Sequence, residues 1–228
     1  MNNWQKIWNK DDRINSIILE SLIKADGFDS GAGSFGVEDW KKYTLEYFQR
    51  LGISSGDTIY DVGCGSGAFL YDLYLQKYSV GGGDYSMSLI HLAKTIMPNG
   101  DFACDEAINI NTDQAYDFIL SHSVFHYFKD LDYAKDVLVK MIQKSNKKIG
   151  IFDINDKAKE NQYHQIRMGD MDRQEYKEKY KGLDHLFYEK NWFKEIAKEF
   201  NLKISIFDQT FENYTNSNLR FNVVMEKR

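Results

Sequence analysis

The segment TIYDVGCGSGAFL, residues 58–70, constrains the fold of this chain more than any other. Its first half is an apolar, β-branched run of the kind that forms a buried parallel strand. Three glycines follow at alternate positions before an apolar helical run begins: Gly63, Gly65 and Gly67. Because glycine has no Cβ, a ligand can approach this turn closely, and the free N–H groups at a helix start favour electron-rich ligand groups. The order strand, glycine turn, helix predicts a site for a nucleotide-like ligand.

Asp61 stands two residues before the first glycine and narrows the choice of ligand. Its carboxylate would repel a dinucleotide pyrophosphate in the same crevice but would hold a cationic amine. Asp61 and the three glycines resemble motif I, acidic-x-Gly-x-Gly-x-Gly, of the class I methyltransferases that use S-adenosylmethionine (SAM). The resemblance implies an α/β fold with a three-layer, Rossmann-like, doubly wound sheet of seven strands, mostly parallel with an antiparallel last strand. It also implies SAM as cofactor and S-adenosylhomocysteine (SAH) as product.

Length and composition fit a single methyltransferase domain over residues 1–228. We divide it into an N-terminal helical segment (1–55), a SAM-binding core (56–156), a lid insertion (157–190) and a closing helix with a strand pair (191–228). The net charge of −5 disfavours a nucleic-acid partner and favours a small-molecule acceptor. Two isolated cysteines indicate a reducing compartment and no metal site. With no apolar run of membrane-spanning length and no signal-peptide pattern, we expect a cytoplasmic protein that does not bind membranes.

Two helices are expected before the glycine motif, over residues 4–24 and 37–51, because apolar residues recur there at helical spacing. Between them, the glycine-rich segment Ser30–Gly36 has no preceding strand, so we interpret it as a hinge or gate and not as a phosphate loop. In the methyltransferases that this chain resembles, the segment before motif I folds over the cofactor. By that resemblance, Trp40 or Tyr43 is expected to touch the methionine end of SAM.

The second strand is predicted at Ser79–Asp84, although its three glycines give it weak strand propensity. Asp84 then lies at the strand tip, within reach of ribose hydroxyls, to which a carboxylate can offer two acceptors. Ser86 is expected to cap the next helix and to lie in the cofactor site, and Tyr85 or Met87 to line the adenine.

The third strand is predicted at DFAC, residues 101–104, and the acidic loop after it is expected to bind the cofactor. The resemblance implies that an acidic residue followed by alanine receives the adenine amino group. The favoured frame is Glu106-Ala107, with Asp105 as the alternative, and a solvent-exposed loop carboxylate is an equally acceptable interpretation.

The fourth strand, YDFILSHS, resembles motif IV of the same family, with small or polar residues at the end that faces the cofactor. Ser121 is therefore a candidate cofactor contact. A fifth strand, residues 147–156, carries Asp153 and Asn155 at its carboxyl end.

Methyl transfer to a hydroxyl needs alignment of the acceptor and a base, and histidine has a pKa that suits a base near neutrality. Three of the five histidines fall at the predicted mouth of the site and are the candidate catalytic residues: His122, His126 and His185. Within the charged lid, the side chains expected to bind the acceptor are Tyr163, Arg167 and Tyr188.

Two other classes of protein remain as alternatives. The run Gly63-x-Gly65-x-x-Ala68 also satisfies the pattern of an NAD-dependent Rossmann oxidoreductase. Asp61, the third alternate glycine and the closing strand pair favour the methyltransferase instead. The second alternative is a non-catalytic SAM-binding protein, which methylation of an acceptor would exclude.

The phrases DINDK and GLDHLFY are similar to small-molecule methyltransferases of bacterial surface-polysaccharide pathways. That similarity implies an acceptor hydroxyl on a sugar or nucleotide-linked precursor. A small metabolite carrying an amine or a carboxylate is the alternative acceptor.

Overall fold

The computed structural model describes residues 12–28, 35–182 and 184–228. The glycine-rich segment predicted as a hinge therefore lies, apart from its last two residues, outside the described part of the chain. Within that part, no helix is long and apolar enough to cross a membrane.

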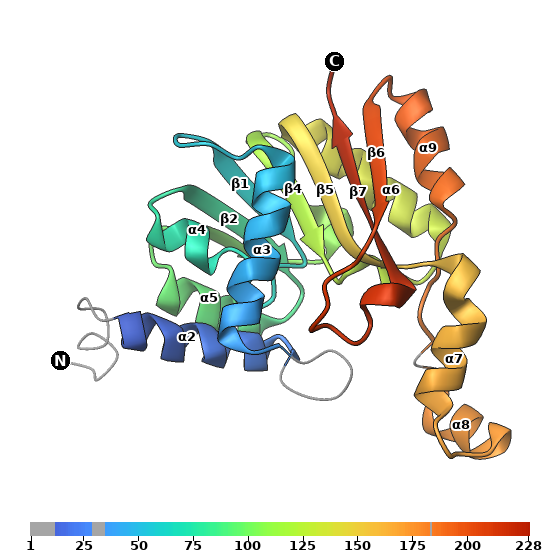
Figure 1. Ribbon diagram of the computed structural model, residues 1–228. Coiled ribbons are helices and arrows are strands. Elements are labelled where there is room, and N and C mark those ends of the chain that lie inside the picture. Colours follow the sequence, from blue (N-terminus) through green and yellow to red (C-terminus); the bar gives the residue numbers. More distant parts are fainter. Residues whose placement is uncertain (1–11, 29–34, 183) are drawn as a thin grey trace.

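Seven strands form one sheet in the order β3-β2-β1-β4-β5-β7-β6 (Figure 1). Their bounds are β1 (Thr58–Val62), β2 (Ser79–Asp84), β3 (Asp101–Cys104), β4 (Tyr116–His122), β5 (Ser145–Asn155), β6 (Lys203–Asp208) and β7 (Arg220–Glu226). The first five are parallel, whereas β7 runs antiparallel to both β5 and β6. The predicted fold class and the antiparallel closing strand are confirmed.

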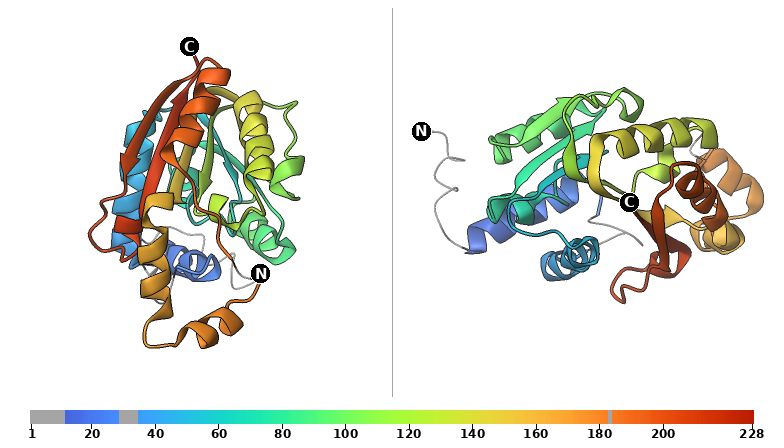
Figure 2. Two further views of the ribbon diagram at one scale, coloured as in Figure 1. Left: turned by 90° about the vertical axis from the view of Figure 1, so that its right-hand side faces the viewer. Right: turned by 90° about the horizontal axis from the view of Figure 1, so that it is seen from above.

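Helices cover both faces of the sheet, and Figure 2 shows α3 and α6 on opposite sides of it. The helices are α2 (Asp12–Ala25), α3 (Val37–Leu51), α4 (Tyr71–Leu75), α5 (Met87–Ile96), α6 (Leu131–Lys144), α7 (Glu160–Met168), α8 (Arg173–Lys179) and α9 (Lys190–Glu199). Alternation along β1 divides the core: Ile59 packs in the cluster that contains α2 to α5, while Tyr60 and Val62 pack in the cluster that contains α6 and α9.

The glycines of β2 are explained by close packing. A Cβ at Gly81 would lie 2.8 Å from the Tyr116 hydroxyl, and one at Gly83 would lie 2.9 Å from the Tyr60 hydroxyl. Tertiary packing therefore overrides the low strand propensity of this segment, as sheet context commonly does.

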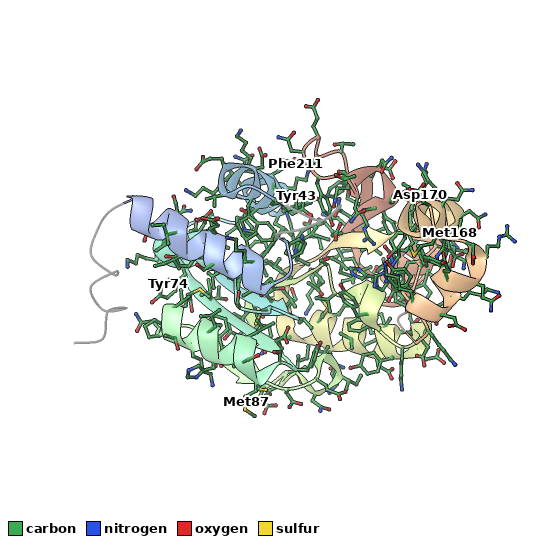
Figure 3. All side chains as sticks on the ribbon, turned by 90° about the horizontal axis from the view of Figure 1, so that it is seen from below. Tyr43, Tyr74, Met87, Met168, Asp170 and Phe211 are labelled. Carbon is green, nitrogen blue, oxygen red and sulfur yellow. The ribbon has the colours of Figure 1, made fainter. Side chains whose placement is uncertain are left out.

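The site lies where the strand order reverses, between β1 and β4, at the carboxyl ends of the parallel strands. Figure 1 shows α7 and α8, the helices of the lid, extending beyond this edge, and Figure 3 looks at the molecule from the same side. The base of the lid is closed by an isolated bridge between Asp156 and Tyr188.

Candidate active site

A cavity of about 1010 Å³ opens at the carboxyl edge of the sheet, between α2, the glycine turn and the lid. Its two ends differ in charge. The acidic end is lined by Asp26, Asp61, Asp84 and Glu106. The basic end is lined by His126, Arg167, His185 and Arg220. The cavity is thus suited to a cationic ligand group at its acidic end and an anionic ligand group at its basic end.

The glycine turn is held against the tip of β2 by hydrogen bonds. Gly63 N donates to Gly83 O over 2.7 Å, and Gly65 N donates to the Asp84 carboxylate over 3.0 Å. Ser86 N donates to the other oxygen of Asp84 over 2.8 Å. Gly65 has a φ of +54°, in the left-handed region that a side chain disfavours. Asp84 is therefore fixed at the cavity wall with lone pairs left for a diol.

Asp61 is 1% exposed, and its Oδ1 atom has no hydrogen-bond partner among the described residues. Burial raises its pKa well above the ordinary value, and the neighbouring Asp26 and Asp84 raise it further. An isolated buried carboxylate is costly unless a cation pairs with it. The acidic end of the cavity therefore lacks a positive charge that a ligand can supply.

Asp26 is a site residue that the sequence analysis missed. It follows α2, and its carboxylate accepts hydrogen bonds from Ser66 N (2.6 Å) and Ala68 N (3.4 Å) beside the glycine turn. Burial raises the pKa of Asp26 to about 7, against the opposing effect of these hydrogen bonds. The N-terminal helix thus contributes a third carboxylate to the acidic end.

The loop after β3 presents Glu106 and Ala107 to the cavity, and Tyr85, 80% exposed, lines its outer wall. Asp105 instead binds the Asn109 side chain over 2.9 Å and does not line the cavity. Of the two frames considered, the Glu106-Ala107 frame is the one that reaches the site.

His122 lies at the end of β4 in an aromatic enclosure. Its ring stacks on Phe69 with centroids 4.5 Å apart, and its Nε2 atom lies 3.0 Å from the Tyr43 hydroxyl. Burial lowers the pKa of His122 to about 4. Trp40 lines the cavity as expected, whereas Tyr43 does not and contacts the site through His122.

His126 and His185 meet at the basic end of the cavity, with ring centroids 5.0 Å apart. His126 is buried and its Nδ1 atom has no hydrogen-bond partner among the described residues. His185 is joined to the Tyr163 hydroxyl through Nδ1 at 2.6 Å. Burial lowers the pKa of both rings, that of His185 to about 4, so both are neutral at neutral pH.

Arg220 and Asp153 lie beneath this end of the cavity. Arg220 begins β7, and Asp153 sits at a register shift of β5 with a φ of +59°. Burial acts to raise the pKa of Asp153, but Arg220 and the two neighbouring histidines lower it below its ordinary value. Asp153 therefore stays ionised, with its nearest cation being Arg220 at 3.5 Å.

Four predicted site residues do not line the cavity. Gly67 leaves room for the Met97 side chain, and Ser86 caps α5. Ser121 is buried and donates to Val62 O over 2.9 Å.

Tyr188 is the clearest correction among them, since it is fully buried and donates to Phe125 O over 2.8 Å. It packs in the core and does not line the cavity, which contradicts its predicted role in binding the acceptor.

The residues present fit the amino group and the ribose of SAM. Asp61 offers an unpartnered carboxylate to the cationic amino group, and Asp84 offers acceptors to the ribose. Gly63 and Gly65 line the cavity, and the lack of a Cβ leaves room for the side chains of Val124 and Asp26 beside the turn. The fold and this cavity together define a Rossmann-like α/β protein of the SAM-binding type.

Comparison with known proteins agrees with that class. The model of a family described as "Methyltransferase domain" matches residues 53–213, and the chain belongs to this family. Over 77 residues the chain is 35% identical to protein 235L of Invertebrate iridescent virus 6, whose given name is that of a methyltransferase. That match spans 33% of this chain and 29% of the viral protein.

Solved structures share the fold. Magnesium protoporphyrin IX methyltransferase from Synechocystis PCC 6803 with bound SAM superposes with a TM-score of 0.59 at 13% identity, covering 96% of this chain and 97% of that one. A SAM-dependent methyltransferase from Clostridium acetobutylicum gives a TM-score of 0.61 at 17% identity, covering 92% and 96%. The plantazolicin methyltransferase BpumL in complex with a pentazolic desmethylPZN analog and SAH gives 0.61 at 18% identity, covering 99% and 95%.

Proposed function

We propose that this chain transfers a methyl group from SAM to a hydroxyl of a small acceptor, a sugar or a nucleotide-linked precursor, bound at the basic end of the cavity. The cavity volume of about 1010 Å³ supports this, because it reaches the upper end of the range of small-molecule sites, about 300–1,000 Å³. It has room for a nucleotide-like cofactor and a small acceptor together.

When bound, SAM supplies a methyl group on a sulfonium centre, which is open to in-line displacement by an acceptor oxygen. The protein's task is then alignment, exclusion of water and removal of one proton. Asp61 and Asp84 hold the cationic and diol groups of the cofactor. The predicted lid segment supplies Tyr163 and His185, which are joined by a hydrogen bond at the acceptor end of the cavity.

The observation that carries the proposal is the unpartnered Nδ1 atom of His126, buried at the cavity wall. In the neutral tautomer that carries its hydrogen on Nε2, an Nδ1 atom without a protein partner can accept a hydroxyl proton. The backbone of His126 is fixed because its carbonyl oxygen accepts from Leu186 N over 2.9 Å. Asp153, ionised nearby, favours the imidazolium that proton transfer would create.

The test is transfer of labelled methyl from SAM to a panel of sugars and nucleotide-linked sugars, with His126→Gln compared to wild type. We expect turnover to fall about 10²–10⁴-fold in this variant, the usual contribution of a general base, while SAH affinity is retained. His91→Gln, which changes an exposed histidine of α5, is the matched control. Absence of transfer to any panel member, or full activity of His126→Gln, would refute the proposal.

A further inference from the structure

Arg220 is the most unusual side chain of the cavity wall. It is 5% exposed, yet its Nε and Nη1 atoms have no hydrogen-bond partner among the described residues. The nearest carboxylate is Asp153, whose Oδ1 lies 3.5 Å from Nε, at ion-pair distance but without a hydrogen bond. Because a buried guanidinium is costly when its donors are unsatisfied, this site is incomplete as the protein chain alone presents it.

Asp153 completes it only in part: it is the ion-pair partner of Arg220, and its oxygens also accept from three neutral donors. Ser123 Oγ donates to it over 2.8 Å, Tyr214 Oη over 3.1 Å and Gln209 Nε2 over 3.1 Å. Because these donors are neutral, the charge of Asp153 still offsets that of Arg220, but the carboxylate satisfies neither Nε nor Nη1 with a hydrogen bond and does not itself line the cavity.

A second guanidinium, that of Arg167, stacks on Tyr180 at 3.9 Å and also lies near the Tyr163 ring. Arg167 of α7 and Arg220 each place their guanidinium carbon 5.8 Å from the centroid of Tyr163. No carboxylate pairs with Arg167 in the part of the chain that the structure describes. Lys129, the other basic residue of the cavity wall, is exposed on the loop before α6. Arg167 and Arg220 thus bring two guanidinium groups to the acceptor end, where none of the described wall residues is a carboxylate and the one paired acid, Asp153, lies behind the wall.

We infer that Arg220 and Arg167 form an anion-binding subsite, and that the methyl acceptor carries a carboxylate or phosphate group which binds there while its hydroxyl faces His126. A guanidinium offers paired N–H donors that match both anions. This inference rests on the proposed function, since it names the class of acceptor for the same site.

The subsite also bears on the proposed base. Burial lowers the pKa of His126, and Arg220 is the next largest contributor in the same direction. An anion bound between the guanidinium groups would offset that positive charge. The charge on the acceptor would therefore make its own deprotonation easier, so a neutral analogue should lose turnover as well as affinity.

The test measures binding to the SAH-saturated protein by isothermal titration, with three probes: glucose 1-phosphate, glucuronate and glucose. We expect one or both charged probes to bind about tenfold or more tightly than glucose, and the comparison between the two distinguishes phosphate from carboxylate. Arg220→Gln and Arg167→Gln should each lose most of this preference. Arg173→Gln, which changes an exposed arginine of α8 in the same lid, should keep it.

Arg167 is half-buried on the lid, so its variant tests the subsite even where Arg220→Gln fails to fold. Retained SAH affinity marks a variant as folded. Equal binding of glucose and both charged probes, or no loss of preference in Arg167→Gln, would overturn the inference. Charged-probe binding without any methyl transfer would leave the subsite standing and refute the proposed function. Transfer to neutral acceptors that is unaffected in both arginine variants would support the proposed function and refute the anion-binding subsite.

Discussion

Replacing Asp61 with asparagine should change stability and cofactor affinity in opposite directions. In the free protein, the carboxylate is 1% exposed, unpartnered at Oδ1 and close to two other acids. Asparagine keeps the shape and removes the charge. The free protein should therefore become more stable at neutral pH, while SAH, which carries a cationic amino group, should bind less tightly.

The magnitudes follow from the burial and the lost charge. A hydrogen bond to a charged group is worth about 1.5–3 kcal/mol, so the dissociation constant of SAH should rise roughly 10- to 150-fold. The raised pKa of Asp61 means that the folded state resists ionisation, so the wild type loses stability as pH rises above about 4. The stabilising effect of Asp61→Asn should therefore be larger at pH 8 than at pH 5.

The assay combines thermal unfolding at both pH values with isothermal titration of SAH. Asp117→Asn is the control, because Asp117 lies on the neighbouring strand β4, accepts from Thr58 N and does not line the cavity. It should leave SAH affinity unchanged. A variant Asp61→Asn that binds SAH like the wild type and is less stable at pH 8 would refute the assignment of Asp61 as the partner of a ligand cation.

Three further changes test the same end of the cavity. The pKa of Asp26 is raised from 3.8 to about 7, so its contribution to the free energy of unfolding should fall by roughly 4 kcal/mol as pH rises through that interval. Asp26→Asn should abolish this part of the pH dependence in thermal unfolding, and a variant whose stability changes with pH as the wild type's does would refute the prediction. Gly65→Val should lower both SAH affinity and the unfolding temperature, because Gly65 has a φ of +54° and a Cβ there would meet the Asp26 carboxylate. Circular dichroism and titration of SAH measure the two effects, and unchanged SAH binding would contradict the prediction. Asp84→Ala should weaken SAH binding tenfold or more, and an unchanged dissociation constant would move the ribose contact elsewhere.

The fold could be predicted from one motif because its residues act locally. The strand, the alternate glycines and the helix start of residues 58–70 are neighbours in sequence, and Asp61 and Asp84 follow from the strand–helix–strand geometry. Even the glycines of β2, unfavourable by propensity, form the strand that this geometry requires.

The parts of the site that sequence did not reveal come from distant segments. Asp26 reaches the glycine turn across 40 residues, and Arg220 comes from the start of the last strand. Neither belongs to a local pattern, although both are ionisable residues beside an apolar run. Tyr188 shows the opposite error: its hydroxyl suggested a ligand contact, but burial and a backbone acceptor give it a structural role.

The most direct test of the account is isothermal titration of the wild-type protein with SAH in the presence and absence of NAD. The acidic end of the cavity, with Asp61 unpartnered and Asp84 bonded to the glycine turn, predicts that SAH binds and that NAD, with its anionic pyrophosphate, does not compete. Tight binding of NAD with no response to SAH would contradict the account.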